Sequence, residues 1–239
     1  MAVLTIARRE LASLFRLPVG WIAVALYLFL AGIVFAYLIL VPGQPASLRP
    51  LFSISAWLLL PVAPAISMRL VSEELRSGTI EPLMTAPVSD GGVVLGKYLG
   101  VVGFLLIMLV PTLAHTAALW WLSDPRPDPG PIAAGYLSLV LVGMVYTAVG
   151  LWMSCLTANQ TLAFLGTLFF LLVVLLATTI GFEYAPAWLQ PVVAELSIQS
   201  RMQEFAKGVI DTSHIVYFLS AAALFVVLSV LTLESRRWR

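Results

Sequence analysis

The stretch RLVSEELRSGTIEPLMTAPVSDGGVVLGK, residues 69–97, interrupts the otherwise apolar first half of the chain. It carries three basic and four acidic side chains, whereas the segments on either side are almost entirely hydrophobic. Charged side chains are costly inside hydrocarbon, and irregular backbone cannot face lipid. The stretch therefore predicts a polar connection on one membrane surface, between two helices that cross the bilayer.

The composition of the whole chain is that of an integral membrane protein. Its 239 residues are 61% hydrophobic and 10% charged, with a mean hydropathy of +1.00. A soluble domain averages ~25% charged residues. The net charge of +1 gives no reason to expect a nucleic-acid partner, and the single cysteine, Cys155, excludes an internal disulfide and a cysteine metal cluster. We expect the lipid bilayer to be the main surrounding of an all-α fold.

Six apolar segments are long enough to cross a bilayer, which needs about 20 residues of helix. They are residues 19–41, 51–70, 93–122, 132–156, 161–180 and 215–233. We expect the whole chain, 1–239, to be a single transmembrane domain built as a six-helix bundle.

Two further segments combine apolar and charged residues. In residues 1–17, Val3, Ile6, Leu14 and Leu17 suit an interfacial helix that lies on lipid; a positive cap that orients the first span explains the segment equally well. Residues 183–213 interleave apolar and charged side chains, which predicts short amphipathic helices against the membrane on the extracytoplasmic side.

An even number of spans places both termini on one side, and the basic residues predict which side. The face with both termini and residues 69–97 carries nine: Arg8, Arg9, Arg16, Arg69, Arg76, Lys97, Arg236, Arg237 and Arg239. The other face carries four: Arg49, Arg126, Arg201 and Lys207. Cytoplasmic loops carry the excess of Lys and Arg, so both termini are predicted to be cytoplasmic in a bacterial inner membrane.

Within the polar connection, residues 78–84 suit a short helix. Thr79 can cap its start, an early Pro82 is tolerated, and Pro87 ends it. The apolar side chains at helical spacing are Ile80, Leu83 and Met84. This apolar knob suits contact with a soluble partner; a solvated loop on the membrane surface is the alternative from periodicity alone.

Several motifs of this region resemble the permeases of type-2 (ABC-2) ATP-binding-cassette exporters. They are Glu73-Glu74, Ser77–Glu81, Leu83, Pro87–Ser89 and Leu95–Gly100, followed later by Thr147–Leu151 with Leu156–Gln160, Lys207–Asp211 and Tyr217–Ser220. The chain is most similar to the gliding-motility permease group (GldF-like), with copper-processing (NosY-like) permeases of metalloenzyme maturation as cousins. The similarity extends over nearly the whole chain.

The resemblance implies a type V exporter-like permease whose residues 77–90 hold a coupling helix. A separate cytoplasmic ATPase would bind ATP and Mg and dock on this helix, and a second permease, identical or paralogous, would complete the transporter. The ATPase-coupling residues would be Glu73, Glu74, Arg76, Gly78, Thr79, Ile80, Glu81, Leu83, Met84 and Pro87. The chain has no GxxxxGK[ST] phosphate loop, so we expect no catalytic residue, bound cofactor or metal in it.

Gly96 and Gly100 form a GxxxG pattern, with Gly103 nearby, which favours close helix packing over dimerisation. His115 is more simply a buried, hydrogen-bonded side chain than a ligand, because no carboxylate lies in the middle of a span.

Two functions remain open. One is ATP-driven export; the other is a mechanical or assembly role on an extracytoplasmic partner, such as a membrane protein with a large external domain. An intramembrane enzyme is disfavoured, because the chain lacks an H-E-x-x-H motif and paired aspartates in its spans. The polar residues of the spans fit lipid-linked, peptide or drug-like cargo equally.

Overall fold

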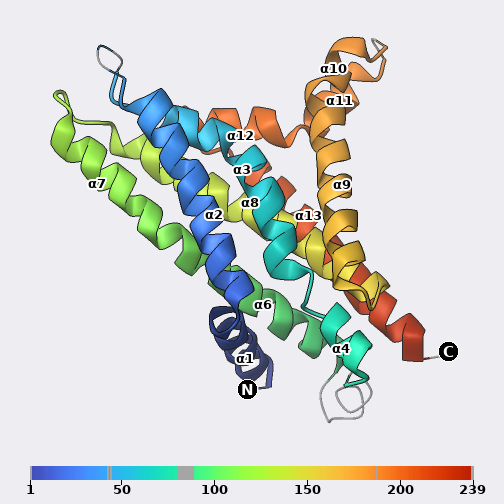
Figure 1. The fold of residues 1–239 in the computed structure, drawn as a ribbon. Coiled ribbons are helices and arrows are strands. Elements are labelled where there is room, and N and C mark those ends of the chain that lie inside the picture. Colours follow the sequence, from blue (N-terminus) through green and yellow to red (C-terminus); the bar gives the residue numbers. More distant parts are fainter. Residues whose placement is uncertain (1, 42, 44, 80–88, 187, 238–239) are drawn as a thin grey trace.

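The structure, a computed structural model, describes residues 2–41, 43, 45–79, 89–186 and 188–237. Every regular element in these ranges is helical, and six helices within them are long and apolar enough to cross a membrane (Figure 1). The fold class predicted from the sequence is therefore confirmed. Residues 80–88, which contain most of the predicted coupling helix, lie outside the described residues.

The chain begins with α1 (Ala2–Arg16), and six candidate spans follow. Their elements are α2 (Pro18–Val34) with the π-helical turn η1 (Phe35–Ile39); α3 (Arg49–Ser67) with α4 (Ser72–Ser77); α6 (Asp90–Leu109), η2 (Val110–Thr112) and α7 (Leu113–Leu122); α8 (Pro129–Leu156); α9 (Gln160–Thr179); and α13 (Thr212–Arg237). Three short helices, α10 (Gly181–Tyr184), α11 (Gln190–Leu196) and α12 (Ile198–Ala206), connect α9 to α13.

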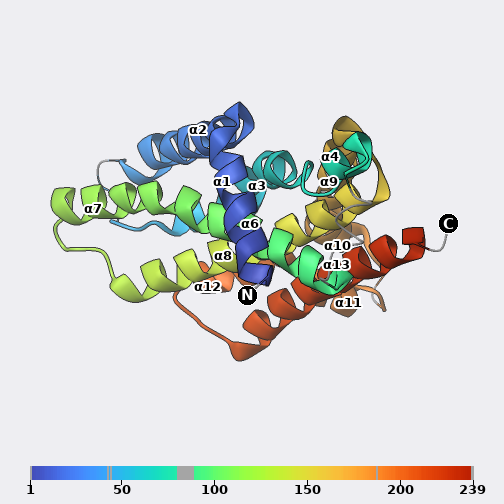
Figure 2. The ribbon, with the colours of Figure 1, turned by 90° about the horizontal axis from the view of Figure 1, so that it is seen from below.

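Both ends of the chain lie at the same end of the bundle. Figure 1 shows α1, α4, the first turns of α6 and the last turns of α13 together there, which we call the terminal end. The helices α10, α11 and α12 lie at the opposite end, which we call the far end. Seen from below, α1 lies across α6 (Figure 2). The polar connection therefore enters and leaves the bundle beside both termini.

Helix α8 is the central helix of the bundle. In its most apolar stretch 72% of the residues are buried, against 22% in α9 and in α13. Three glycines on α8 let neighbouring helices approach closely: a Cβ added at Gly135 would lie 2.1 Å from the Phe52 ring, one at Gly143 2.3 Å from Leu105, and one at Gly150 1.8 Å from Ser67 Oγ. Small residues at contacts are how membrane helices gain packing energy, since lipid supplies no hydrophobic drive between them.

The third span is interrupted at Pro111, where the backbone forms the single 3-10 turn η2 between α6 and α7. A side chain from another helix contacts the backbone at this break: the hydroxyl of Tyr136 on α8 donates to the carbonyl of Thr112 at 2.9 Å. Tyr136 also lies 3.1 Å from the hydroxyl of Thr116. Tyr136 thus supplies polar contacts on both sides of the start of α7, where no water is at hand in a membrane core.

Helix α12 differs from the prediction of amphipathic helices against the membrane. Its apolar face, with Ile198, Met202 and Phe205 buried, packs on α3 and α8 at the far end. A side-chain hydrogen bond fixes it there, from Gln199 Nε2 to the carbonyl oxygen of Ser53 at 2.6 Å. The periodicity of an amphipathic helix predicts that its apolar face is buried. Here other helices of the protein bury that face.

The guanidinium of Arg201 joins the three last helices. Its Nη2 donates to both the carbonyl and the carboxylate oxygen of Glu195 on α11, each at 2.7 Å. Its Cζ lies 4.3 Å above the ring of Tyr217 on α13. A buried cation that is paired and stacked in this way holds α11, α12 and α13 as one unit.

The glycines of α8 supply a test of the packing. Gly135→Ala places a methyl group against the buried ring of Phe52, so we expect overpacking to destabilise the protein by about 1–3 kcal/mol. The measurement is the thermal unfolding midpoint of the protein in detergent. Gly32→Ala is the matched control, because a Cβ there meets nothing within 4 Å; it should unfold no earlier than the wild type, and equal midpoints for the two variants would contradict the packing.

Candidate functional site

The residues of the polar connection that the structure describes are on α4 and the turn after it. Glu73, Glu74 and Arg76 lie on α4, which ends where Gly78 takes a left-handed conformation with φ of 70°. Glycine is favoured at this C-cap because it lacks a Cβ. Thr79 follows, its hydroxyl 2.8 Å from that of Ser77. Five predicted coupling residues lie outside the described residues: Ile80, Glu81, Leu83, Met84 and Pro87.

A buried lysine ties three helices together beside this segment. Lys97 Nζ on α6 lies 2.7 Å from a carboxylate oxygen of Glu74 on α4 and 2.9 Å from one of Glu10 on α1. The side chain of Lys97 is 2% exposed, and those of Glu10 and Glu74 are 13% and 15% exposed. Arg9 completes an electrically neutral group, 3.2 Å from both carboxylates. We call Arg9, Glu10, Glu74 and Lys97 the ion-pair cluster.

Burial makes the cluster interdependent. An unpaired ammonium or carboxylate at such a site would cost several kcal/mol of desolvation. Lys97 is covered on nearly all sides, so its charge is tolerated only while both carboxylates face it. Arg9 is 61% exposed and contributes far less, because solvent screens its pairs. The position of Glu74, the residue nearest the coupling segment in this cluster, is therefore coupled to α1 and α6 together.

The glycines of the GxxxG pattern lie where α1 crosses α6. A Cβ at Gly96 would lie 2.8 Å from the side chain of Ile6, and one at Gly100 would lie 2.7 Å from Cβ of Glu10. Gly103 is less crowded, at 3.8 Å from Leu11. The face predicted for close packing is thus occupied by α1 of the same chain, and the contact at Gly100 is what brings Glu10 to Lys97.

This contact also changes the interpretation of α1. Ile6 packs on Gly96, and Leu14 is buried in the core, where the sequence suggested that both lie on lipid. An amphipathic helix of 15 residues has one apolar face, and α6 covers it here.

One serine on α8 holds the corner between α3 and α4. Ser154 Oγ accepts hydrogen bonds from the backbone N–H groups of Val71 and Ser72, both at 2.9 Å, and donates to the carbonyl of Met68 at 3.1 Å. These backbone groups are free because the helix breaks between α3 and α4. Nothing in the sequence singled out Ser154, Arg9 or Glu10 for the site; the only signal was that each is a polar residue in an apolar or basic segment.

The remaining predicted residues form local contacts. Arg69, at the end of the second span, forms a bidentate ion pair with Glu73 one turn later. Its Nη2 lies 2.6 Å from one carboxylate oxygen and its Nε 3.0 Å from the other. Arg76 is exposed and forms no ion pair within the part of the chain that the structure describes. No three His, Cys, Asp or Glu side chains of the described ranges gather closely enough to hold a metal ion. The contacts of this site connect α1, α3, α4, α6 and α8 at the terminal end.

Comparison with known proteins agrees with a membrane transporter. The sequence profile of a family described as "ABC-2 family transporter protein" matches residues 4–237. Two relatives in Escherichia coli, from strains K12 and O157:H7, are both described as "Probable multidrug ABC transporter permease YbhR". Each is 27% identical over 124 residues, which cover 50% of this chain and 32% of the relative. The similar region thus spans about a third of the length of these relatives.

The ion-pair cluster yields a stability prediction. Lys97→Met leaves two carboxylates side by side in a buried site, so we expect a loss of about 3–5 kcal/mol in the free energy of unfolding and a lower thermal midpoint in detergent. Arg9→Met is the control, with an expected loss below about 1 kcal/mol because Arg9 is exposed. Adding Glu10→Gln to Lys97→Met should restore part of the loss. If Lys97→Met and Arg9→Met unfold at the same temperature, the cluster does not hold the helices together.

Proposed function

Because this chain belongs to the ABC-2 family of transporter proteins, it is a transmembrane permease of an ATP-binding-cassette transporter, and we propose that a separate cytoplasmic ATPase drives export through it. In this proposal the ATPase binds ATP and Mg and docks on residues 77–90. ATP binding moves the docked segment, and the segment moves the spans to which it is joined.

The observation that carries the proposal is the fixation of α4 to three neighbouring helices. Glu74 is paired with Lys97 on α6 and, through it, with Glu10 on α1, while Ser154 on α8 binds the backbone just before α4. A segment attached to its spans by a flexible linker could be pulled without moving them. A segment attached by buried charges and backbone hydrogen bonds passes its displacement to α1, α6 and α8.

The position of this segment supports docking at one surface. The end of α4 and the start of α6 both lie at the terminal end, with α1 and the last turns of α13 (Figure 1). The excess of basic residues on that end favours the cytoplasm of a bacterial inner membrane. We therefore propose that Ile80, Leu83 and Met84 are the apolar anchors in a groove of the ATPase, since such anchors dominate small interfaces. A second permease copy or a paralogue would complete the transporter.

A mechanical or assembly function is the second candidate. The resemblance to gliding-motility permeases suggests it, and the far end offers a surface for an external partner. Tyr184, Trp188 and Leu196 on and beside α10 and α11 are 82%, 78% and 50% exposed. In this alternative the motion of the spans acts on a partner protein instead of moving a solute.

Docking is tested by charge substitution in the proposed anchors. Ile80→Asp with Leu83→Asp should weaken the association of the permease with its ATPase about 30-fold or more, because a hot-spot residue is worth at least ~2 kcal/mol. The measurement is co-purification of the ATPase with tagged permease, alongside permease-stimulated ATP hydrolysis. Ile210→Asp, the same change at an exposed residue of the far end, is the control. Full association of the double variant would contradict the coupling role.

Transport and mechanical work are separated by reconstitution. Liposomes containing only the permease and its ATPase should show ATP-dependent flux of a multidrug-type or lipid-linked probe if the protein is an exporter. Flux that Ile80→Asp abolishes would support export. ATP hydrolysis without flux of any probe, restored to function only by a third membrane protein, would support the mechanical alternative.

A further inference from the structure

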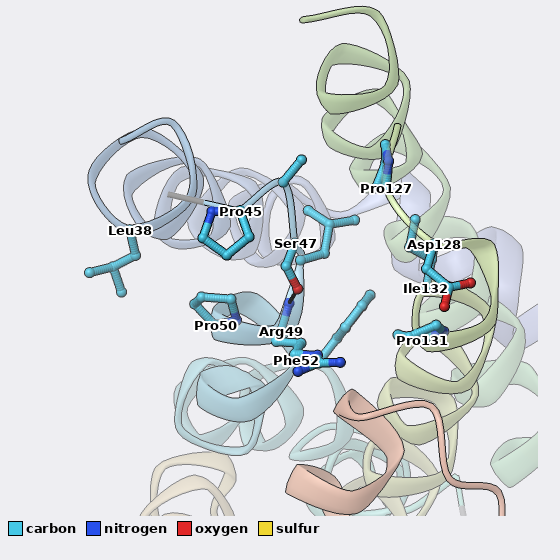
Figure 3. Close-up of a pocket in the computed structure, with 12 residues that line it drawn as sticks. Leu38, Pro45, Ser47, Arg49, Pro50, Phe52, Pro127, Asp128, Pro131 and Ile132 are labelled. Carbon is cyan, nitrogen blue, oxygen red and sulfur yellow. Dashed lines mark hydrogen bonds between the residues drawn. The ribbon is translucent and has the colours of Figure 1, made fainter. Parts of the chain in front are cut away.

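A cavity of about 420 Å³ opens at the far end between η1, the start of α3 and the start of α8 (Figure 3). Its walls are mostly apolar, with Leu38, Phe52 and Ile132 among them. Two charged side chains of opposite sign also line it, Arg49 and Asp128. Figure 3 shows that they come from different elements, Arg49 from the start of α3 and Asp128 from the residue before α8. The cavity plays no part in the proposed coupling to an ATPase.

The cavity lies at the level of a membrane interface. Tyr37, next to Leu38, is 76% exposed, and Trp121 at the end of α7 is 89% exposed. Exposed Tyr and Trp side chains at the ends of spans mark the headgroup region of a bilayer. Leu38 is itself 48% exposed and lines the cavity, so the cavity adjoins exposed apolar surface of the bundle.

Arg49 is arranged to receive an anion. It is the first residue of α3, and its guanidinium forms no ion pair with any described residue. A cation at the positive end of a helix dipole is unfavourable by itself. An anion placed on Arg49 would be stabilised both by the guanidinium and by the N-terminus of α3.

The start of α8, on the opposite side, presents the carboxylate of Asp128 in place of free amide donors. Pro129 and Pro131 have no amide proton, and the amide of Gly130 already donates to Asp128 Oδ1 at 3.0 Å. The first turn of this helix therefore offers few donors to an anion. Asp128 is an exposed residue, and a carboxylate accepts hydrogen bonds from a primary ammonium.

We propose that this cavity binds the headgroup of a phospholipid whose phosphate pairs with Arg49 and whose primary ammonium pairs with Asp128, as in phosphatidylethanolamine. The acyl chains extend along the exposed apolar surface beside Leu38. Charge complementarity selects the headgroup: an anionic lipid satisfies Arg49 but leaves Asp128 without its cation, and a lipid with a quaternary ammonium offers no N–H group to the carboxylate. The bound lipid fixes the connection between η1 and α3 against α8.

The test uses the full chain in detergent, with native mass spectrometry to resolve each bound lipid. The probes are phosphatidylethanolamine, phosphatidylglycerol with the same acyl chains, and soluble glycerophosphoethanolamine. For the wild type we expect a first molecule of phosphatidylethanolamine to bind more tightly than any further molecule of the same lipid. It should also bind more tightly than phosphatidylglycerol. Arg49→Gln should weaken that first site about tenfold, the loss of one charge-assisted contact.

Two further variants separate this site from general surface charge. Asp128→Asn keeps an N-cap oxygen for Gly130, so α8 stays capped, but it should abolish the preference for phosphatidylethanolamine over phosphatidylglycerol. Arg126→Gln removes a neighbouring charge that stacks on Trp120, outside the cavity lining, and should leave binding unchanged.

Three results that concern the cavity itself would overturn the proposal. They are wild-type affinity for phosphatidylethanolamine in Arg49→Gln, retention of the headgroup preference in Asp128→Asn, and binding of glycerophosphoethanolamine as tight as that of the lipid. The last would show a site for a soluble headgroup rather than a membrane lipid. An equal loss in Arg126→Gln would likewise reject a specific cavity.

Discussion

Lys97 is the charge on which the terminal end of the bundle depends. An ammonium that is 2% exposed is stable only when carboxylates surround it, and its two carboxylates come from two other helices. The pairs oblige α1, α4 and α6 to meet at one point, although apolar packing alone would allow each to slide. Gly96 and Gly100 make this meeting possible, because any side chain there would hold α1 away from α6. The ion pairs of Lys97 thus fix the relative positions of α1, α4 and α6 along their axes, and the two glycines fix the distance between α1 and α6.

The central helix extends this constraint across the bundle. Gly135, Gly143 and Gly150 bring α3 and α6 into direct contact with α8, and Ser154 captures the corner before α4. Interiors packed this closely do not deform continuously; they move as rigid units. In the proposed mechanism, a displacement at residues 77–90 therefore tilts α3, α6 and α8 as a body, and the far-end helix α12, fixed to α3 through Gln199 and Ser53, follows them.

The sequence predicted the spans well and their partners poorly. Hydrophobic length is a local property, so six helices could be located without knowing how they pack. The Gly96–Gly100 pattern predicted that another helix packs closely on α6. Whether that helix is α1 or belongs to a second chain depends on tertiary structure. The apolar faces of α1 and α12 raised the same difficulty: periodicity shows that a face is covered, and lipid and protein cover it equally well. The ion-pair cluster was half visible, since Glu74 stood out in the polar connection, whereas Glu10 is close to it only in space.

The ion-pair cluster lies where the proposed coupling segment joins the spans. The apolar anchors proposed at Ile80, Leu83 and Met84 follow α4 within a few residues, and Glu74 and Lys97 lie on either side of them in the chain. The helices on both sides of the connection, α4 and α6, are therefore attached to the same buried group. A force on the segment between them therefore acts on one shared group, the ion-pair cluster, instead of on two independent helices. Because the cluster is neutral in total charge, it can move as a unit without exposing an unpaired ion to the protein interior. In the proposed mechanism a permease that is moved by a partner needs this property at its point of attachment, and the neutral group of Lys97, Arg9, Glu10 and Glu74 provides it.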